Sequence, residues 1–255
     1  MSGSSLDGTV ALVTGASSGI GRGAARRLAA EGAAVALLAR RGDRLEELRE
    51  EIEGDGARAL VIEADVGDRA AAEAAIQRTV DELGRLDTLV NNAGVMLLGP
   101  IADAPIEEWE RMVDVNVLGL MYCARAVLPH VVSAAADAPR RVADIVNVSS
   151  VAGRVARKGS GVYNLTKHGV GAFSESLRQE LAGRLVRVSL VEPGAVATEL
   201  TSHNRPEILE QLKSRFSEID RLEDSDIADA IAYIVTRPRH VAVNELLIRP
   251  TEQEE

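Results

Sequence analysis

Tyr163 and Lys167 lie four residues apart in a stretch that we expect to be helical. Positions i and i+4 share one face of a helix, so the phenol and the ammonium can approach each other. An ammonium ~4 Å away, at an effective dielectric of ~20, attracts a phenolate by up to ~4 kcal/mol. This would lower the phenol pKa from ~10 by up to ~3 units, which suits general acid–base catalysis. The alternative is an amphipathic helix with a partly buried tyrosine and an exposed lysine.

Two serines follow an apolar run that we expect to be a buried strand, residues 142–148. Ligands of an open parallel sheet bind beyond the carboxyl ends of its strands, so a hydroxyl there can hydrogen-bond a substrate oxygen. Ser150, 13 residues before Tyr163, is the candidate (163 − 150 = 13). Its neighbour Ser149 is the alternative.

The stretch TGASSGIG, from Thr14 to Gly21, predicts a phosphate-binding turn. Glycines there would let the backbone approach a pyrophosphate at a helix N-terminus. The stretch also contains G-x-S-x-G, the nucleophile pattern of serine hydrolases. That nucleophile normally follows several strands, whereas fewer than twenty residues precede Ser17, so a hydrolase is a remote alternative. No Gly-Lys-Ser/Thr follows, which excludes a Walker A loop.

Short apolar runs alternate with longer amphipathic stretches along the whole chain. We expect strands at 10–13, 34–39, 59–63, 86–90, 142–148, 186–191 and 246–248. We expect helices at 20–31, 44–53, 69–83, 106–132 and 162–181, the fourth broken near Asn116 and Gly119 and bent at Pro129. Continuously apolar strands indicate a parallel sheet covered on both faces. The alternation therefore predicts an α/β fold, a doubly wound parallel sheet of Rossmann type with about seven strands.

Composition narrows the class of protein. A net charge of −10 and a 2% aromatic content argue against nucleic-acid binding. The single cysteine, Cys123, excludes an intramolecular disulfide, and four scattered histidines show no metal-ligand spacing. Residues 1–7 contain no apolar signal region, and no uninterrupted apolar run approaches the ~18 residues of a membrane span. We expect a cytoplasmic protein with no metal and no membrane partner.

No linker divides the chain, so we expect one dinucleotide-binding catalytic domain over residues 1–255 with flexible ends at 1–6 and 251–255. Two segments break the alternation. Residues 133–141 are expected to be an exposed loop, and the long polar segment 195–222 is expected to be a substrate lid.

Together these motifs resemble the short-chain dehydrogenase/reductase family. The resemblance rests on Thr14-Gly15-x-x-x-Gly19-x-Gly21, Asn91-Asn92-Ala93-Gly94, Ser150, Tyr163, Lys167 and Pro193-Gly194. The segments NNAGVMLLGP and LLIRPTEQ further resemble the branch that contains clavulanate dehydrogenase and related NADPH-dependent reductases. The resemblance favours Ser150 over Ser149 and implies that Asn116 completes the catalytic set by holding a water near Lys167.

The resemblance also implies a nicotinamide dinucleotide site. Its expected members are Gly15, Ser17, Ser18, Gly19, Ile20, Gly21, Arg40, Arg41, Asp65, Val66, Asn92, Ala93, Gly94, Tyr163, Lys167, Pro193, Gly194, Val196 and Thr198. Met96, Ser150, Val151 and Tyr163 are expected to line the substrate pocket.

The end of the second expected strand indicates which nicotinamide is used. NAD-specific sites place an acid there, about 20 residues past the glycine turn, to bind the ribose 2′-hydroxyl. This chain has Ala39 at that position, followed by Arg40 and Arg41. A guanidinium can bind a 2′-phosphate through charge-assisted hydrogen bonds. We therefore predict NADP(H) as the cofactor, with Arg40 at the phosphate and Arg41 stacking on adenine or assisting.

These observations predict an NADP-dependent oxidoreductase. It would transfer hydride between NADP(H) and a small or medium polar aldehyde or ketone, or oxidise the alcohol, within secondary metabolism. The resemblance implies a homo-oligomer, a tetramer or a dimer. A non-catalytic dinucleotide-binding regulator on the same fold is the alternative.

Overall fold

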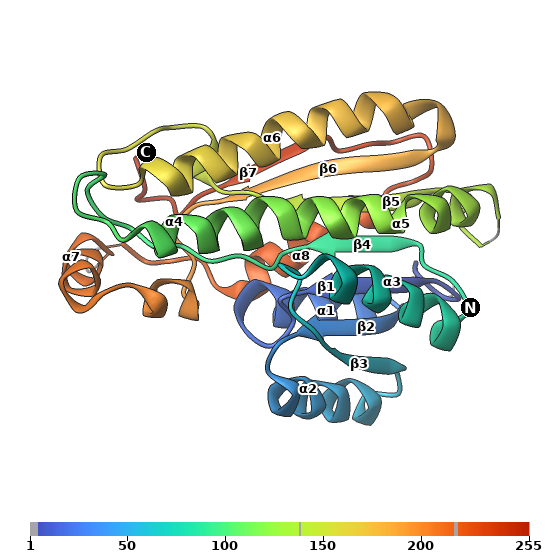
Figure 1. The fold of residues 1–255 in the computed structure, drawn as a ribbon. Coiled ribbons are helices and arrows are strands. Elements are labelled where there is room, and N and C mark those ends of the chain that lie inside the picture. The colour runs from blue at the N-terminus through green and yellow to red at the C-terminus, as the bar shows by residue number, and fades with distance from the viewer. Residues whose placement is uncertain (1–4, 138, 217–218, 255) are drawn as a thin grey trace.

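Seven strands form one parallel sheet in the computed structural model, which describes residues 5–137, 139–216 and 219–254 (Figure 1). The strands are β1 (Val10–Thr14), β2 (Ala34–Ala39), β3 (Ala59–Glu63), β4 (Thr88–Asn91), β5 (Ala143–Val148), β6 (Val186–Pro193) and β7 (Glu245–Ile248). Their order is β3-β2-β1-β4-β5-β6-β7. The order reverses between β1 and β4, the place where an open α/β sheet binds its ligand.

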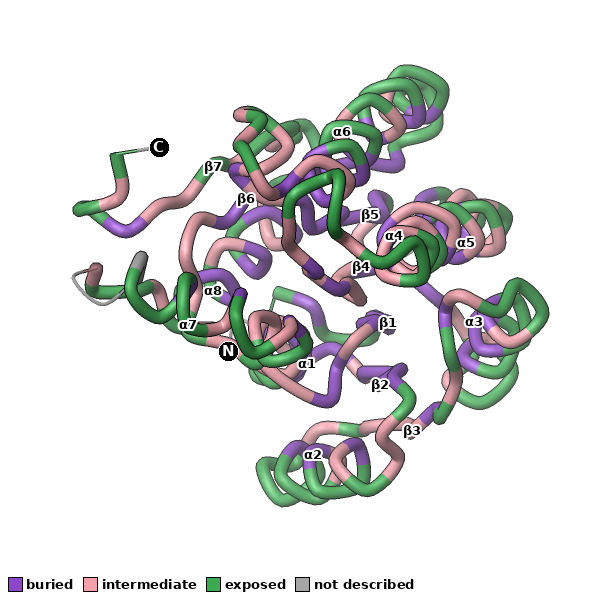
Figure 2. The backbone as a smooth tube through the Cα atoms, turned by 60° about the vertical axis from the view of Figure 1, so that its left-hand side comes forward, coloured by how far each residue is buried: buried purple, intermediate pink, exposed green. Residues whose placement is uncertain are grey.

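Helices cover both faces of this sheet (Figure 2). The helices α1 (Gly19–Ala30), α2 (Gly42–Gly54) and α8 (Asp224–Val235) pack on one face. The helices α3 (Arg69–Leu83), α5 (Leu120–Ala136) and α6 (Gly161–Leu181) pack on the other. Neighbouring strand residues serve opposite faces: Val13 joins the first core and Leu12 the second. Both faces of a strand are therefore buried, which explains the continuous apolar runs and confirms the predicted doubly wound fold.

The long helical region after β4 differs from the prediction in two places. Helix α4 (Ile106–Val113) continues into α5 through a π-helix at Asp114–Gly119, so the expected break is a local widening of the helix. Helix α5 runs through Pro129 to Ala136, so the prediction of a loop from residue 133 is wrong. Ala134 and Ala135 are buried, and their packing against the sheet extends the helix.

A 3-10 helix and two α-helices follow β6, where the sequence indicated a weakly helical segment or no element. The segment 195–222, which we call the lid segment, contains a 3-10 helix η4 (Glu199–His203) and α7 (Pro206–Phe216). Helix α8, which was not predicted, buries Ile227 and Ile231 against α1.

Both ends of the described chain contact the folded body. Leu6 is buried, and its backbone N–H bonds the carbonyl of Glu31. The Gln253 side chain accepts a hydrogen bond from the N–H of Ala195 at 2.8 Å. The expectation of flexible ends at 1–6 and 251–255 stays a prediction, and residues 1–4 and 255 lie outside the described part.

One stretch, Ile106–Ala136, is long and apolar enough to cross a membrane by length and composition. The sequence prediction counted uninterrupted apolar residues and missed it. In this fold the stretch lies along the sheet and contributes Cys123, Val127 and Val131 to the core, as a core helix of a globular protein does.

Candidate active site

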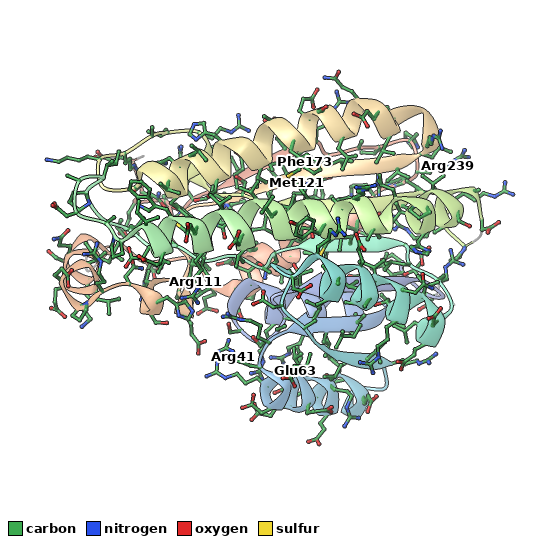
Figure 3. The ribbon with its side chains drawn as sticks, viewed as in Figure 1. Arg41, Glu63, Arg111, Met121, Phe173 and Arg239 are labelled. Carbon is green, nitrogen blue, oxygen red and sulfur yellow. The ribbon has the colours of Figure 1, made fainter. Side chains whose placement is uncertain are left out.

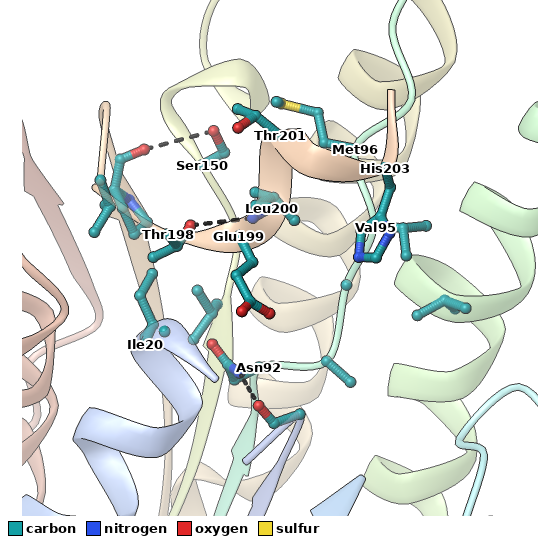
Figure 4. A pocket seen from close by; sticks show the side chains of 18 of the residues that line it. Ile20, Asn92, Val95, Met96, Ser150, Thr198, Glu199, Leu200, Thr201 and His203 are labelled. Atoms are coloured by element: carbon teal, nitrogen blue, oxygen red, sulfur yellow. Dashed lines mark hydrogen bonds between the residues drawn. The ribbon is translucent and has the colours of Figure 1, made fainter. Parts of the chain in front are cut away.

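A pocket of about 340 Å³ opens at the carboxyl ends of the central strands (Figure 4). At the reversal of strand order, the Thr14 hydroxyl accepts hydrogen bonds from the N–H groups of Asn92 and Ala93, both at 3.0 Å. The Asn92 side chain donates to the carbonyl of Thr14. These bonds fix the ends of β1 and β4 together, so the floor of the pocket is held rigidly.

The pocket gathers residues from across the chain. Every cofactor residue predicted from the sequence lines it except Gly21, together with the predicted substrate residues Met96, Ser150, Val151 and Tyr163. Gly21 lies behind the surface, where a Cβ would overlap the carbonyl of Gly15. A glycine is therefore needed at this position for close packing within the turn, and not for contact with the pocket.

The glycine turn leads from β1 into the start of α1. Gly15 and Gly19 have φ values of 68° and 50°, a region that side chains disfavour. A Cβ on Gly15 would also lie 2.9 Å from the Cα of Ala93. Ser17, the serine of the hydrolase-like pattern, accepts hydrogen bonds from Arg41. The turn thus combines a close backbone approach with a helix N-terminus and a cation, which together suit a phosphate.

The structure places Arg41, rather than Arg40, against this turn. Arg41 Nη2 donates to Ser17 Oγ at 3.0 Å and to Ser18 Oγ at 2.8 Å. Arg40 instead faces Asp65, with 3.8 Å between Nη1 and Oδ2. Figure 3 shows Arg41 reaching out between α2 and the lid segment. Both arginines line the pocket, and the geometry favours Arg41 as the one beside the turn. The part that each would play at a 2′-phosphate stays a prediction.

Ser150, Tyr163 and Lys167 line the same pocket. The Ser150 hydroxyl accepts from the N–H of Ala152 at 3.1 Å, and its proximity favours the ionised form of the Tyr163 phenol. Ser149 is buried, and its hydroxyl donates to the carbonyl of Lys167 at 3.0 Å. Lys167 Nζ donates to the carbonyl of Val148 at 3.0 Å and lies 5.9 Å from the centroid of the Tyr163 ring. The geometry favours Ser150 as the hydroxyl that shares a substrate with Tyr163.

Burial decides the acidity of this pair. Burial raises the pKa of Tyr163 to about 12, although the nearby Ser150 hydroxyl acts in the opposite direction. Burial also lowers the pKa of Lys167 to about 8. The predicted lowering of the tyrosine pKa is therefore wrong for this chain, because desolvation outweighs any attraction to the lysine. At neutral pH the phenol is protonated and can donate a proton.

Asn116 lies behind the pocket wall, in the π-helical segment. Its Oδ1 accepts from the N–H of Val95 at 2.8 Å, and its Nδ2 donates to the carbonyl of Val95 and to Thr166. A Cβ on Gly94 would be 3.3 Å from Asn116 Oδ1 and 3.8 Å from Lys167 Nζ. Asn116 thus holds the strand-end loop beside the lysine. Its expected part in a water relay stays a prediction.

Glu192, one residue before Pro193, is buried to 1% exposure. Both of its carboxylate oxygens accept from Arg154 Nε at 2.8 Å, and Arg154 also pairs with Glu245. This buried charge is therefore compensated. The pairing ties the end of β6 to β7 and to the loop after β5, and so supports the segment that carries Pro193 and Gly194.

Several lining residues were not named individually by the sequence reasoning. Residues of the segment 195–222 were expected over the pocket, and the structure identifies them as Glu199, Leu200, Thr201, His203 and Leu212. The loop before α6 and the first turn of α6 were not expected there, and they contribute Arg157, Ser160 and Asn164. Asn204 fastens the lid segment by bonding the N–H of Leu98 and the carbonyl of Met96 at 2.7 and 2.8 Å. No spacing pattern identifies the individual side chains, because the fold decides which residues of each segment face the pocket.

A model of the family described as short chain dehydrogenase matches residues 9–209. The chain belongs to the short-chain dehydrogenase family. This confirms the family resemblance and shows the chain to be of an oxidoreductase family. The similarity to the narrower clavulanate dehydrogenase branch stays a prediction.

Similar short-chain dehydrogenases include an uncharacterized oxidoreductase of Staphylococcus epidermidis, 36% identical over 94% of this chain and 96% of that protein. The glycine betaine reductase of Emericella nidulans is 40% identical over 97% of this chain, which spans only 19% of that longer protein. Among solved structures, a closed form of serine dehydrogenase complexed with NADP⁺ superposes with a TM-score of 0.88 at 35% identity, covering 97% of both chains. A metagenomic short-chain oxidoreductase in complex with NADP has a TM-score of 0.81 at 33% identity, covering 97% of this chain and 100% of that one.

Proposed function

We propose that this short-chain dehydrogenase is an NADP(H)-dependent carbonyl reductase or alcohol dehydrogenase. The observation that carries the proposal is that one pocket is lined both by Arg41 with two serine hydroxyls and by Tyr163 with Ser150. The NADP-bound structural relatives support the same cofactor.

The residues at the glycine turn fit NADP(H). The strand position that would carry an acid for the ribose 2′-hydroxyl is Ala39, which is buried and offers no carboxylate. Arg41, Ser17 and Ser18 can hold the 2′-phosphate, since a guanidinium and hydroxyls match phosphate oxygens. The bound nicotinamide would supply or accept the hydride.

Tyr163 would donate its proton to the carbonyl oxygen as the carbonyl carbon is reduced. Its raised pKa keeps the phenol protonated at pH 7, the form that the reductive direction requires. Ser150 would orient the same oxygen by a hydrogen bond. Lys167, held under the tyrosine by Val148, would return a proton after turnover.

The substrate class is a small or medium polar aldehyde or ketone. Polar side chains of Ser160, Asn164, Thr201 and His203 line the pocket beside the apolar Met96. Two relatives, a serine dehydrogenase and a glycine betaine reductase, are likewise named for small polar molecules. A place in secondary metabolism and a cytoplasmic location stay predictions.

A homo-oligomer, tetramer or dimer, also stays a prediction. The helices α4, α5 and α6 carry exposed apolar side chains at Ile106, Met121 and Leu165 that a second copy could cover. Light scattering from the purified protein would measure the number of copies.

The test is reduction of a panel of polar aldehydes and ketones by NADPH. Tyr163→Phe should bind NADPH almost as the wild type does, while turnover falls ~10²–10⁴-fold, as expected for loss of a general acid. Tyr233→Phe, at a half-exposed tyrosine of α8 that stacks on Arg237, is the matched control and should keep full activity. Near-normal turnover by Tyr163→Phe would overturn the mechanism. Tight NADPH binding by a wild type without turnover would instead indicate a regulator.

A further inference from the structure

The lid segment is fastened at its base and at its far end. At the base, Val196 and Leu222 form a β-bridge, and the N–H of Ala197 bonds the carbonyl of Leu222 at 2.8 Å. At the far end, Arg205 pairs with Glu108 at 3.2 Å. Between these points η4 begins at Glu199, whose side chain extends into the pocket (Figure 4).

The Glu199 carboxylate contacts two arginines beside the glycine turn, Arg41 and Arg44. Its Oε2 is 2.9 Å from Arg41 Nη1, and its Oε1 is 2.8 Å from Arg44 Nη1. The same Arg41 guanidinium donates to Ser17 and Ser18. Hydrogen bonds from Arg44 and Arg41 lower the pKa of Glu199 to about 2, so the carboxylate is ionised at neutral pH. An anion of this chain therefore occupies the cationic site.

We propose that Glu199 is a specificity-determining residue that competes with the cofactor's 2′-phosphate for Arg41 and Arg44. The inference rests on the proposed NADP(H) site. A phosphate monoester carries about −1.5 to −2 charges and three acceptor oxygens at pH 7, so it displaces a carboxylate that is 46% exposed. A nucleotide without the 2′-phosphate leaves Glu199 on the arginines. Binding of NADP(H), but not of NAD(H), thus releases the first turn of the lid segment from α2.

Removal of the Glu199 charge should strengthen phosphate binding, because the site does not need Glu199 to be built. Ser17 and Ser18 hold Arg41 in place independently of Glu199. Arg44 lies in the first turn of α2, so its backbone position does not depend on Glu199. Exposed ion pairs each contribute little, so we expect a gain of about 3- to 30-fold in affinity.

The test is calorimetric titration of the wild type and of Glu199→Gln with two probes, 2′,5′-ADP and 5′-AMP. Glu199→Gln should bind 2′,5′-ADP about 3- to 30-fold more tightly and 5′-AMP unchanged. Glu210→Gln is the matched control: Glu210 lies on α7 of the same segment, pairs with Lys213 and is 74% exposed. It removes the same charge and should change neither affinity.

Three outcomes would overturn the inference: equal or weaker binding of 2′,5′-ADP by Glu199→Gln, an equal gain for 5′-AMP, or an equal gain in Glu210→Gln. Failure of the proposed cofactor site would look different, since the wild type itself would then bind 2′,5′-ADP no better than 5′-AMP. Glu199→Ala repeats the test without an amide that could bond the arginines. Matching thermal melts would establish that the variants are folded.

Discussion

Replacement of the buried Lys167 by methionine should stabilise the protein at neutral pH while impairing reduction. The ammonium is 7% exposed, and burial lowers its pKa from 10.5 to about 8. Methionine has a similar length and an unbranched stem, so it can fill the same space. The buried charge lowers the stability of the folded protein, and the substitution removes this penalty. Natural enzymes keep such destabilising groups where catalysis requires them.

The magnitude follows from linkage. Between pH 8 and 10.5 the unfolded chain keeps the Lys167 proton that the folded chain has released, so the wild type gains stability as pH rises through this window. Below pH 8 the full penalty of ~3 kcal/mol applies, from a shift of about 2.5 units at 1.36 kcal/mol each. The variant also loses the hydrogen bond to the Val148 carbonyl, worth ~1 kcal/mol. The net gain of the variant in the free energy of unfolding is ~2 kcal/mol at pH 7, and this gain falls to about zero by pH 10.

The assay is urea unfolding at pH 7 and pH 10, followed by fluorescence of the single tryptophan, Trp109, at fixed protein concentration. The raised pKa of Tyr163 affects the alkaline stability of both proteins and cancels in their difference. Lys213→Met, at a lysine that is 71% exposed, is the control and should change stability by less than ~0.5 kcal/mol. The reasoning fails if Lys167→Met is no more stable than the wild type at pH 7, or if its advantage is as large at pH 10.

The remaining predictions concern the two ends of the cofactor site. Arg41→Ala should raise the Kd of NADPH about tenfold or more and leave the Kd of NADH unchanged. This is near the lower limit for the loss of charge-assisted hydrogen bonds, because the Arg41 side chain is 40% exposed. Arg40→Ala, whose side chain faces Asp65, should do less, and equal losses by fluorescence titration would contradict this assignment. Gln253→Ala removes the acceptor for the N–H of Ala195 and should raise the KM for NADPH ~3- to 10-fold. Steady-state kinetics would measure this change, with the exposed Gln211→Ala as the control. An unchanged KM would mean that Gln253, near the C-terminus, does not shape the pocket.

Much of the fold could be predicted because its signals are local. Strands buried on both faces read as apolar runs, so β2 and β3 were predicted with their observed bounds. Helix α8 was not predicted, because its packing against α1 stabilises a helix that its own residues do not indicate. Helix α5 ends later than expected, because packing against the sheet extends it. The glycine turn and the Tyr163–Lys167 spacing were equally visible, since each depends on residues close in sequence.

The sequence by itself determined which residue types are available: a phenol, a lysine, a pair of serines and two adjacent arginines. The tertiary structure decided what they do to one another. Burial by surrounding elements reversed the expected shift in the Tyr163 pKa, because desolvation sums over atoms from the whole fold. The fold also placed Arg41 against the serines of the glycine turn and brought Glu199, 158 residues away, to the same guanidinium. A contact across that separation depends on how β6 and the lid segment return to β1, which no local pattern encodes.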